Sequence, residues 1–269
     1  MNNADLIVEI LRTAGISHGF GIPSGNVLPL MEAMRIGGIE YVLTAHEGSA
    51  AFCADVTGRI TGSPGLCIST LGPGATNLST GVGSAFLDRS PLLAITCNLN
   101  VEQLGRRIQM YVDHHALFAP ITKASLALRG GKIVQTLVAA IQTALSEPQG
   151  PVHLDLPEDV ALGTSTESAP HVLGTPTALP AADNSTLATA ASLIAEANHP
   201  VAVIGASAMR MSNPNLLCEF VEHHQLPFAS TTMAKGLIDE DHPLAIGCIE
   251  RARRQVQRKF LQQADLVVG

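Results

Sequence analysis

Residues 45–62, AHEGSAAFCADVTGRITG, and residues 69–77, STLGPGATN, are the two stretches that decide the fold. In the first, Glu47 follows a short strand-like run and opens a helix rich in alanine. In the second, an apolar run passes through a Gly-Pro-Gly turn into another helix. Because the strand-to-helix turns of a parallel sheet open at one edge, this spacing predicts that both turns meet there. Glu47 then lies among apolar side chains, a poorly hydrated setting that suits an acid for proton transfer.

Strand and helix signals alternate around these two stretches. We expect helices at residues 4–14, 26–36, 47–61, 76–87 and 132–146, and strands at residues 17–21, 39–43, 65–70, 92–97 and 152–156. Strand runs such as LLAITC and VHLDL are continuous rather than alternating, which is typical of a parallel sheet covered on both faces. The predicted fold class is therefore α/β, with a doubly wound parallel sheet.

The composition changes after this first region. Residues 157–182 are rich in Pro, Ser, Thr, Ala and Gly without a helical period, which indicates an interdomain linker. We expect a first domain at 1–160, a linker at 161–182 and a second domain at 183–269. In the second domain helices are expected at residues 184–198, 213–224 and 250–263, and strands at residues 200–205, 226–229 and 265–268. A Rossmann-like domain does not close with so few strands, so we expect this one to be incomplete and the chain to be an N-terminal fragment.

Composition also narrows the classes of partner. Hydrophobic residues make up 46% of the 269 residues, charged residues only 14%, and the formal net charge is −7. Without a dense patch of lysine and arginine, nucleic acid and anionic membrane are not expected partners. The low charged fraction instead predicts contact with another subunit. The five cysteines form no CxxC pair and read as reduced thiols of a cytoplasmic protein, and no apolar run approaches the roughly 18 residues of a membrane span.

Two local patterns have plain structural interpretations beside functional ones. The segment HGFGIPSG (18–25) has the spacing GxGxxxG with an inserted proline, which does not match a dinucleotide-binding loop. It is either an ordinary tight turn or a turn that brings backbone close to a flat ligand. Glu47 taken alone is explained by the favourable interaction of an acid with a helix N-terminus. The ten histidines do not pair with cysteines or carboxylates at ligand spacing, so no metal site is expected in this chain.

Together these segments form an ordered series. From HEGSAAFCADVTGRITG to GPGATN, it resembles the pyrimidine-binding domain of thiamine diphosphate-dependent enzymes, in the acetolactate synthase and benzoylformate decarboxylase group. FGIPSGNVLPLMEAM (20–34) looks like that family's first turn, and later landmarks are DRSPLLAIT (88–96), APITKAS (119–125) and GPVHLDLPEDV (150–160). The resemblance covers residues 1–160 and continues more loosely through STTMAKGLIDEDHPLAIG (230–247), which is similar to the family's central domain.

The resemblance implies a cofactor and a set of residues that hold it. In this family thiamine diphosphate binds between two subunits, and a glutamate hydrogen-bonds N1′ of the aminopyrimidine and thereby promotes loss of the C2 proton. Glu47 is the matching residue and the expected catalytic acid. The other expected cofactor-binding residues are Pro23, Gly25, Asn26, Thr70, Gly72, Pro73 and Asn77. Ordinary turn chemistry is the alternative for each of these. A homodimer or homotetramer is implied as well.

The resemblance also implies a small-molecule substrate, a 2-oxo acid or an aldehyde. An acetolactate synthase-like enzyme decarboxylates or cleaves the donor and joins the fragment to an acceptor. His114, in QMYVDHHALFAPITK (109–123), is the expected substrate residue, and a solvent-exposed helix start is the alternative. Gly25 stands where some decarboxylases of this group carry Asp, and Gln109 and Met110 match the synthases' Gln-rich run poorly. The alternatives are therefore a 2-oxo acid decarboxylase, an aldehyde lyase, an acyl transferase or a non-catalytic subunit that keeps the fold.

One half of the cofactor site is not expected in this chain. In the family the diphosphate and Mg²⁺ are held by a third domain with a GDG segment, and no GDG occurs in this sequence. We therefore expect weak or no binding of thiamine diphosphate by these 269 residues alone. The central domain of some relatives holds FAD, and the residues of this chain do not decide whether it does so here.

Overall fold

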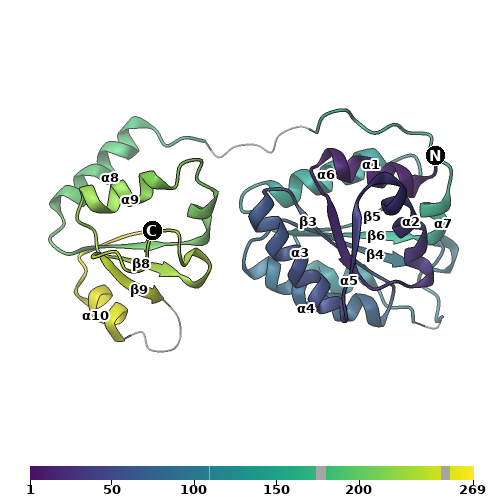
Figure 1. Cartoon of the computed structure of the whole chain (residues 1–269), viewed down its shortest axis with the longest axis horizontal. Helices are drawn as coiled ribbons and strands as arrows, with labels where there is room; N and C mark the ends of the chain where they lie inside the picture. Colours follow the sequence, from purple (N-terminus) through teal and green to yellow (C-terminus); the bar gives the residue numbers. More distant parts are fainter. Residues whose placement is uncertain (109, 174–179, 250–254) are drawn as a thin grey trace. The chain divides into compact units, whose positions relative to one another are not determined.

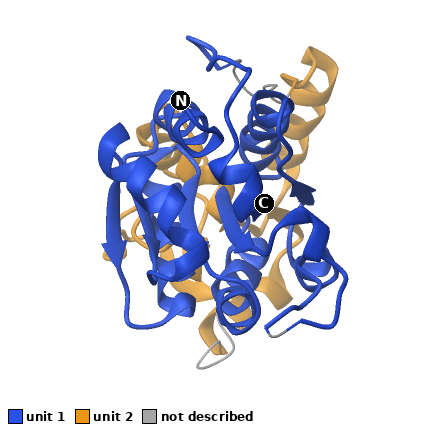
Figure 2. Ribbon diagram, turned by 90° about the vertical axis from the view of Figure 1, so that its right-hand side faces the viewer, with its two compact units in different colours: residues 1–179 blue, residues 180–269 orange. Residues whose placement is uncertain are grey.

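The computed structural model describes residues 1–108, 110–173, 180–249 and 255–269. The chain divides into two compact units, Met1–Leu179 and Pro180–Gly269. Figure 1 shows the whole chain coloured by residue number, and Figure 2 shows the two units in different colours. Each unit is built on one sheet, and every strand pair within the two sheets is parallel. The prediction of an α/β fold with parallel sheets is confirmed.

Unit 1 contains a six-stranded sheet in the order β2-β1-β3-β4-β6-β5. Its strands are β1 (His18–Gly21), β2 (Glu40–Leu43), β3 (Gly65–Ser69), β4 (Leu92–Asn98), β5 (Ala124–Ala127) and β6 (Pro151–Pro157). Its helices are α1 (Asn3–Thr13), α2 (Leu28–Gly37), α3 (Glu47–Thr61), α4 (Pro73–Leu87), α5 (His114–Phe118), α6 (Ile133–Leu145) and α7 (Glu158–Leu162).

Helices cover both faces of this sheet (Figure 1). One hydrophobic core joins the sheet to α1, α2 and α6, and includes the fully buried Leu6, Ile10, Leu30 and Leu137. A second core joins the opposite face to α3, α4 and α5, and its members are smaller, with many alanines and Phe118 as the largest side chain. The small residues let α3 and α4 pack closely, because short side chains at the contact allow two helix backbones to approach each other.

The strand order reverses at one point in the sheet. From β1 the chain passes to β2 on one side, and from β3 it passes to β4 on the other side. Loops at the carboxyl ends of strands beside such a reversal open into a common crevice, which is where α/β folds bind ligands. In this chain the loops after β1, β2 and β3 carry residues 22–26, Glu47 and residues 70–77. The fold therefore brings the two opening sequence stretches to one place.

The structure differs from the sequence prediction in several elements. The strands β5 and β9 and the short helices α5 and α7 were not predicted. The segment that forms β5, ASLA, is a four-residue edge strand without a β-branched residue, so it gives little strand signal. Helix α4 begins at Pro73 rather than at residue 76, because proline fits the first turn of a helix, where its missing N–H is not needed.

Part of the segment predicted as a linker lies against unit 1. Thr164 forms an isolated bridge with Asn2. The Glu167 carboxylate accepts the backbone N–H groups of Ile133 at 2.8 Å and Val134 at 3.2 Å. These N–H groups belong to the first turn of α6 and have no partner within the helix, so Glu167 caps it. Residues 174–179 of the predicted linker lie outside the described residues, and the domain bounds stay a prediction.

Unit 2 contains a four-stranded sheet in the order β10-β7-β8-β9. Its elements are α8 (Asn184–Glu196), β7 (Pro200–Ile204), α9 (Asn215–His223), β8 (Phe228–Thr231), β9 (Ala245–Ile249), α10 (Gln255–Gln263) and β10 (Leu266–Val268). The start of the helix expected at 250–263 falls on residues 250–254, which lie outside the described residues. Among the helices that the structure does describe, none is long and apolar enough to cross a membrane.

Candidate active site

The Glu47 carboxylate lies at the first residue of α3. His46 caps this helix, since its Nδ1 accepts the backbone N–H of Gly48 at 3.0 Å. The Glu47 side chain is buried, with 9% of the residue exposed. Asn77 of α4 donates a hydrogen bond from Nδ2 to Oε2 of Glu47 at 3.0 Å. The carboxylate is thus fixed by the helix N-terminus and by a neutral amide, two interactions that hold its position without a counter-charge.

Two glycines make room beside this carboxylate. Gly72 has a φ of 59°, and a Cβ at this position would lie 2.2 Å from the carbonyl oxygen of Met110. A Cβ on Gly74 would lie 2.8 Å from Cγ2 of Thr70 and 3.5 Å from Oε1 of Glu47. The turn therefore requires glycine at position 72, whereas at position 74 a side chain would press on the Thr70 methyl group and narrow the space beside Glu47. The hydrogen bond from Asn77 reaches Oε2, so Oε1 faces the space that the absence of a Gly74 side chain leaves.

Two hydroxyl groups beside this turn have no partner among the described residues. Oγ of Ser69 and Oγ1 of Thr70 are buried and make no hydrogen bond. A buried hydroxyl without a partner costs free energy, so such groups mark places where a ligand can complete the hydrogen bonding. Both hydroxyl groups belong to residues next to the Gly72 turn, which makes this turn a candidate ligand site.

The first turn of the sheet lies at the same edge. Pro23 and Gly25 are exposed, and a Cβ on Gly25 would have no neighbour within 4 Å. Asn26 is half-buried, and its Nδ2 donates to Oε2 of Glu158 at 3.1 Å and to the carbonyl oxygen of Asn98 at 3.4 Å. Asn26 thus connects this turn to the ends of β4 and β6. Contact of these three residues with a cofactor stays a prediction.

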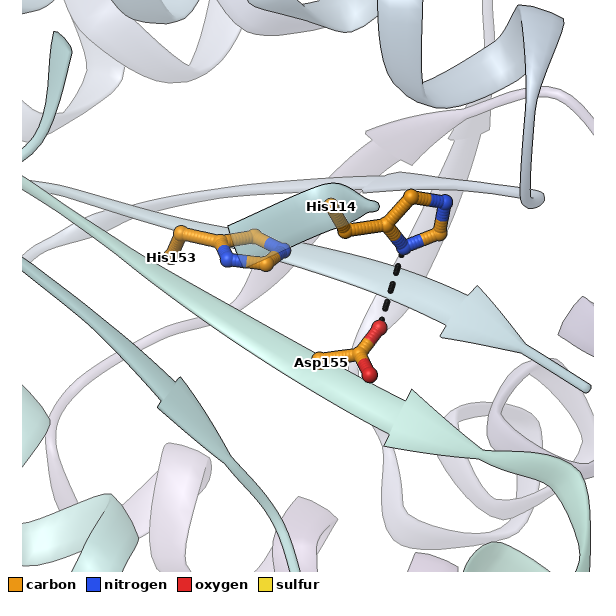
Figure 3. A group of neighbouring side chains, drawn as sticks. All are labelled: His114, His153 and Asp155. Atoms are coloured by element: carbon orange, nitrogen blue, oxygen red, sulfur yellow. Dashed lines mark hydrogen bonds and ion pairs between the residues drawn. The ribbon is translucent and has the colours of Figure 1, made fainter. Parts of the chain in front are cut away.

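His114 is the first residue of α5, and it is buried, with 2% of the residue exposed. The alternative of a solvent-exposed helix start is wrong. Its Nδ1 lies 3.0 Å from Oδ1 of Asp155, as Figure 3 shows. Its Nε2 accepts the backbone N–H of Gly72 at 3.3 Å. His114 also lines a pocket of about 720 Å³, together with Asn98, Tyr111, His115 and Asp155. A role with substrate stays a prediction.

The polar network around His114 was not predicted from the sequence. Oγ1 of Thr96 lies 2.9 Å from Nδ1 of His114, 2.8 Å from Nε2 of His153 and 3.3 Å from Oδ1 of Asp155. Asn98 donates to Oδ1 of Asp155 at 2.9 Å. On the other side of the His153 ring, Nδ1 lies 2.7 Å from Oγ of Ser125. The same hydroxyl oxygen lies 2.7 Å from Nδ1 of the half-buried His115.

A signal for this network is present in the sequence. In VHLDL (152–156), His153 and Asp155 alternate with apolar residues, and so do Thr96 and Asn98 in the neighbouring strand. Register pairs Thr96 with Asp155, so all four side chains lie on one face of the sheet. That polar face was not predicted, because the apolar residues between the polar ones make these strands resemble continuous apolar runs.

The network combines an ionised carboxylate, that of Asp155, with a neutral imidazole, that of His153. Burial raises the pKa of Asp155, but hydrogen bonds from His114 and Asn98 and the nearby imidazoles outweigh it and hold the pKa below its usual range. Burial lowers the pKa of His153 to about 3, so this ring is neutral. Phe118 stacks on the His153 ring with centroids 4.3 Å apart, which adds to its desolvation.

Among the residues that the structure describes, two groups of side chains come close enough together to hold a metal ion, contrary to the spacing argument. In His114, His153 and Asp155 the Thr96 hydroxyl already occupies the space between the three ligand atoms. In the second group, Cys218, Glu222 and His242, Nδ1 of His242 accepts the Leu244 N–H. Its Nε2 therefore carries the proton that it donates to Glu222. We assign no metal ion to either group.

A pH dependence of stability follows from the buried His153. Because its pKa is about 3 in the folded chain and about 6.5 when unfolded, the unfolded chain binds more protons between these values. Stability should therefore fall as the pH falls, by up to about 1.4 kcal/mol per pH unit from this group. Protonation of Asp155 also lowers the stability, but only below about pH 4, because its pKa is lowered in the folded chain.

The test is urea unfolding of unit 1 at several pH values between about pH 6 and pH 4.5. In this range His153 contributes to the pH dependence of stability and Asp155 does not. In His153→Gln this slope should fall by about 1 kcal/mol per pH unit. The exposed His171→Gln is the matched control and should keep the slope. Equal slopes in all three proteins would contradict the assignment.

Comparison with known proteins places this chain in a family. The N-terminal TPP binding domain of thiamine pyrophosphate enzymes matches residues 1–117, and the central domain of the same enzymes matches residues 187–269. The chain belongs to the thiamine pyrophosphate enzyme family.

Its relatives include acetolactate synthases. A probable acetolactate synthase large subunit of Methanocaldococcus jannaschii is 33% identical over all of this chain and 46% of the relative. The acetolactate synthase isozyme 1 large subunit of Escherichia coli is 33% identical over 98% of this chain and 47% of the relative. An acetolactate synthase of Arthrospira platensis is 35% identical over 93% of this chain and 45% of the relative. The chain spans about half the length of these proteins.

Proposed function

We propose that this chain carries the pyrimidine-binding part of a thiamine diphosphate-dependent enzyme that acts on 2-oxo acids, as acetolactate synthases do. The enzyme cleaves or decarboxylates a donor and joins the fragment to an acceptor. The carrying observation is the Glu47 carboxylate, which is buried at the switch point of the sheet and held at Oε2 by Asn77, with Oε1 left open.

The surrounding residues fit the cofactor's aminopyrimidine ring. Oε1 of Glu47 would share a proton with a ring nitrogen, and the burial of Glu47 supports this role because it limits competition from water. Thr70 has a buried, unpartnered hydroxyl and turns its methyl group toward Gly74, while Gly72 and Pro73 shape the turn. Bound thiamine diphosphate supplies the carbon centre that stores the electrons released by cleavage next to a carbonyl group.

We further propose an assembly and a location. Phe52, Val56 and Ile60 form an apolar stripe along α3, with exposed fractions of 44%, 45% and 76%. Such a stripe supports a homodimer or homotetramer. The five cysteines are free, which supports a cytoplasmic location. Mg²⁺ is proposed as the partner of the diphosphate, for which this chain has no GDG segment, and we assign no FAD site to the described residues.

The test uses the protein that the gene encodes from Met1 to its stop codon, so that it does not depend on where the chain ends. It is incubated with thiamine diphosphate, Mg²⁺ and pyruvate, with and without an acceptor aldehyde. Formation of acetolactate supports the proposal. Acetaldehyde alone would instead indicate a decarboxylase, a product made only with the aldehyde a lyase or acyl transferase, and no cofactor-dependent product would support the non-catalytic alternative and overturn the proposal.

A further inference from the structure

The strongest observation that the proposed function does not use is the environment of the His114 ring. Both ring nitrogens have partners inside the fold: Nε2 faces the Gly72 backbone N–H, whereas Nδ1 lies near Oδ1 of Asp155, Oγ1 of Thr96 and, at 3.3 Å, Nδ2 of Asn98. Gly72 offers a backbone N–H, which can only donate. Asp155 offers a carboxylate, which accepts, and its pKa below the usual range keeps it ionised.

These partners decide where the proton of the ring lies. Nε2 must carry a free lone pair, since it accepts the Gly72 N–H at 3.3 Å. The proton of the neutral ring is then on Nδ1, where Oδ1 of Asp155 at 3.0 Å and Oγ1 of Thr96 at 2.9 Å accept it. A proton on Nε2 would face the Gly72 N–H and abolish that hydrogen bond. This assignment does not depend on the tautomer of His153, because the Thr96 hydroxyl can accept or donate.

The hydrogen bond from Gly72 connects this network to the cofactor turn. Gly72 is the N-cap of α4, and its φ of 59° is a conformation that few residues adopt. The next residues of the turn are Pro73 and Gly74, and one turn of α4 later Asn77 holds the Glu47 carboxylate. Fixing Gly72 therefore fixes the start of the helix on which the Glu47 contact depends.

We propose that His114 is a positioning residue, which the carboxylate of Asp155 holds with its proton on Nδ1 so that Nε2 anchors the Gly72 turn against Glu47. Its role is to keep that turn in shape, rather than to exchange protons with a substrate. The tautomer and the anchor are properties of the chain itself, whereas their importance for the cofactor rests on the proposed function.

The chain itself provides the first test, without cofactor. In the uniformly ¹⁵N-labelled protein, Nε2 of His114 is expected to show the shift of an unprotonated nitrogen and Nδ1 that of a protonated one. A scalar coupling between the Gly72 amide nitrogen and Nε2 across the hydrogen bond is also expected. A proton on Nε2 at neutral pH, or no coupling, overturns the proposal.

Two substitutions then separate anchoring from packing. His114→Gln keeps an acceptor oxygen near the position of Nε2, whereas His114→Leu fills the space without one. Hydrogen exchange of the Gly72 amide should become about tenfold faster in His114→Leu, equivalent to ~1.4 kcal/mol for one hydrogen bond. In His114→Gln and in the exposed control His171→Gln it should stay close to the original rate. Equal acceleration in the Gln and Leu variants overturns the anchoring role.

The final readout uses the cofactor-dependent reaction. His114→Gln should retain kcat, while His114→Leu should raise the thiamine diphosphate concentration needed for half-maximal rate. Loss of kcat in His114→Gln with normal Gly72 exchange would favour a direct role with substrate and overturn the proposal. If the nitrogen shifts and exchange rates agree but the unchanged protein shows no reaction, the proposed function fails and the anchoring role stands.

Discussion

Replacing Glu47 with glutamine is expected to slow exchange of the C2 proton of bound thiamine diphosphate with D₂O by about 10²–10⁴-fold, the usual contribution of one acid–base group. Glutamine has nearly the same shape, and its amide oxygen can still accept the hydrogen bond from Asn77. Its amide nitrogen then occupies the position of Oε1. That nitrogen donates hydrogen bonds and does not take up a proton, so the shared proton on which activation depends has no place to go.

The measurement is quenched-flow hydrogen–deuterium exchange followed by proton NMR, on the full gene product with cofactor and Mg²⁺. Glu9→Gln is the matched control, because Glu9 is an exposed residue of α1 and the chemical change is the same. Both variants should unfold at the urea concentration of the original protein. Exchange in Glu47→Gln at the original rate would remove Glu47 from the proposed role.

The position of Glu47 was predictable because it depends on local pattern and on topology. An apolar strand followed by an acid and an alanine-rich helix is visible in the sequence, and parallel strands bring their carboxyl ends to one edge. The same reasoning located the Gly72 turn. Element types were predicted well where the segment was long and apolar, and poorly for β5, whose four residues have no strong preference.

The His114 network was less accessible because its members are far apart in sequence. Thr96, His114 and Asp155 come from β4, α5 and β6, and only the register of the strands brings them together. The sequence shows that each is polar in an apolar segment. It does not show that His114 faces inward, because α5 is only five residues long and gives no helical period. The cofactor roles of Pro23, Gly25 and Asn26 stay predictions, because the conformation of a backbone turn does not show which ligand binds against it.

Two glycines of α4 should respond to alanine in opposite directions. A Cβ on Gly81 would lie 2.5 Å from Cβ of Ala51 and 2.9 Å from the backbone nitrogen of Phe52, so it would push α4 away from α3. Such overpacking costs roughly 1–3 kcal/mol, and we expect Gly81→Ala to destabilise unit 1 by about 2 kcal/mol. A Cβ on Gly83 would have only Cγ2 of Ile121 nearby, at 3.8 Å, so Gly83→Ala should stabilise it by roughly 0.5–1 kcal/mol through lower backbone entropy.

The same pair tests whether helix packing sets the active-site geometry. Glu47 begins α3 and Asn77 lies on α4, so the 3.0 Å hydrogen bond between them depends on the spacing of the two helices. Gly81→Ala should therefore shift the side-chain amide resonance of Asn77 and slow cofactor activation, while Gly83→Ala should leave both unchanged. Urea unfolding measures the first effect and NMR the second. If Gly81→Ala were as stable as Gly83→Ala, the close contact of α3 and α4 would not hold Glu47 in place.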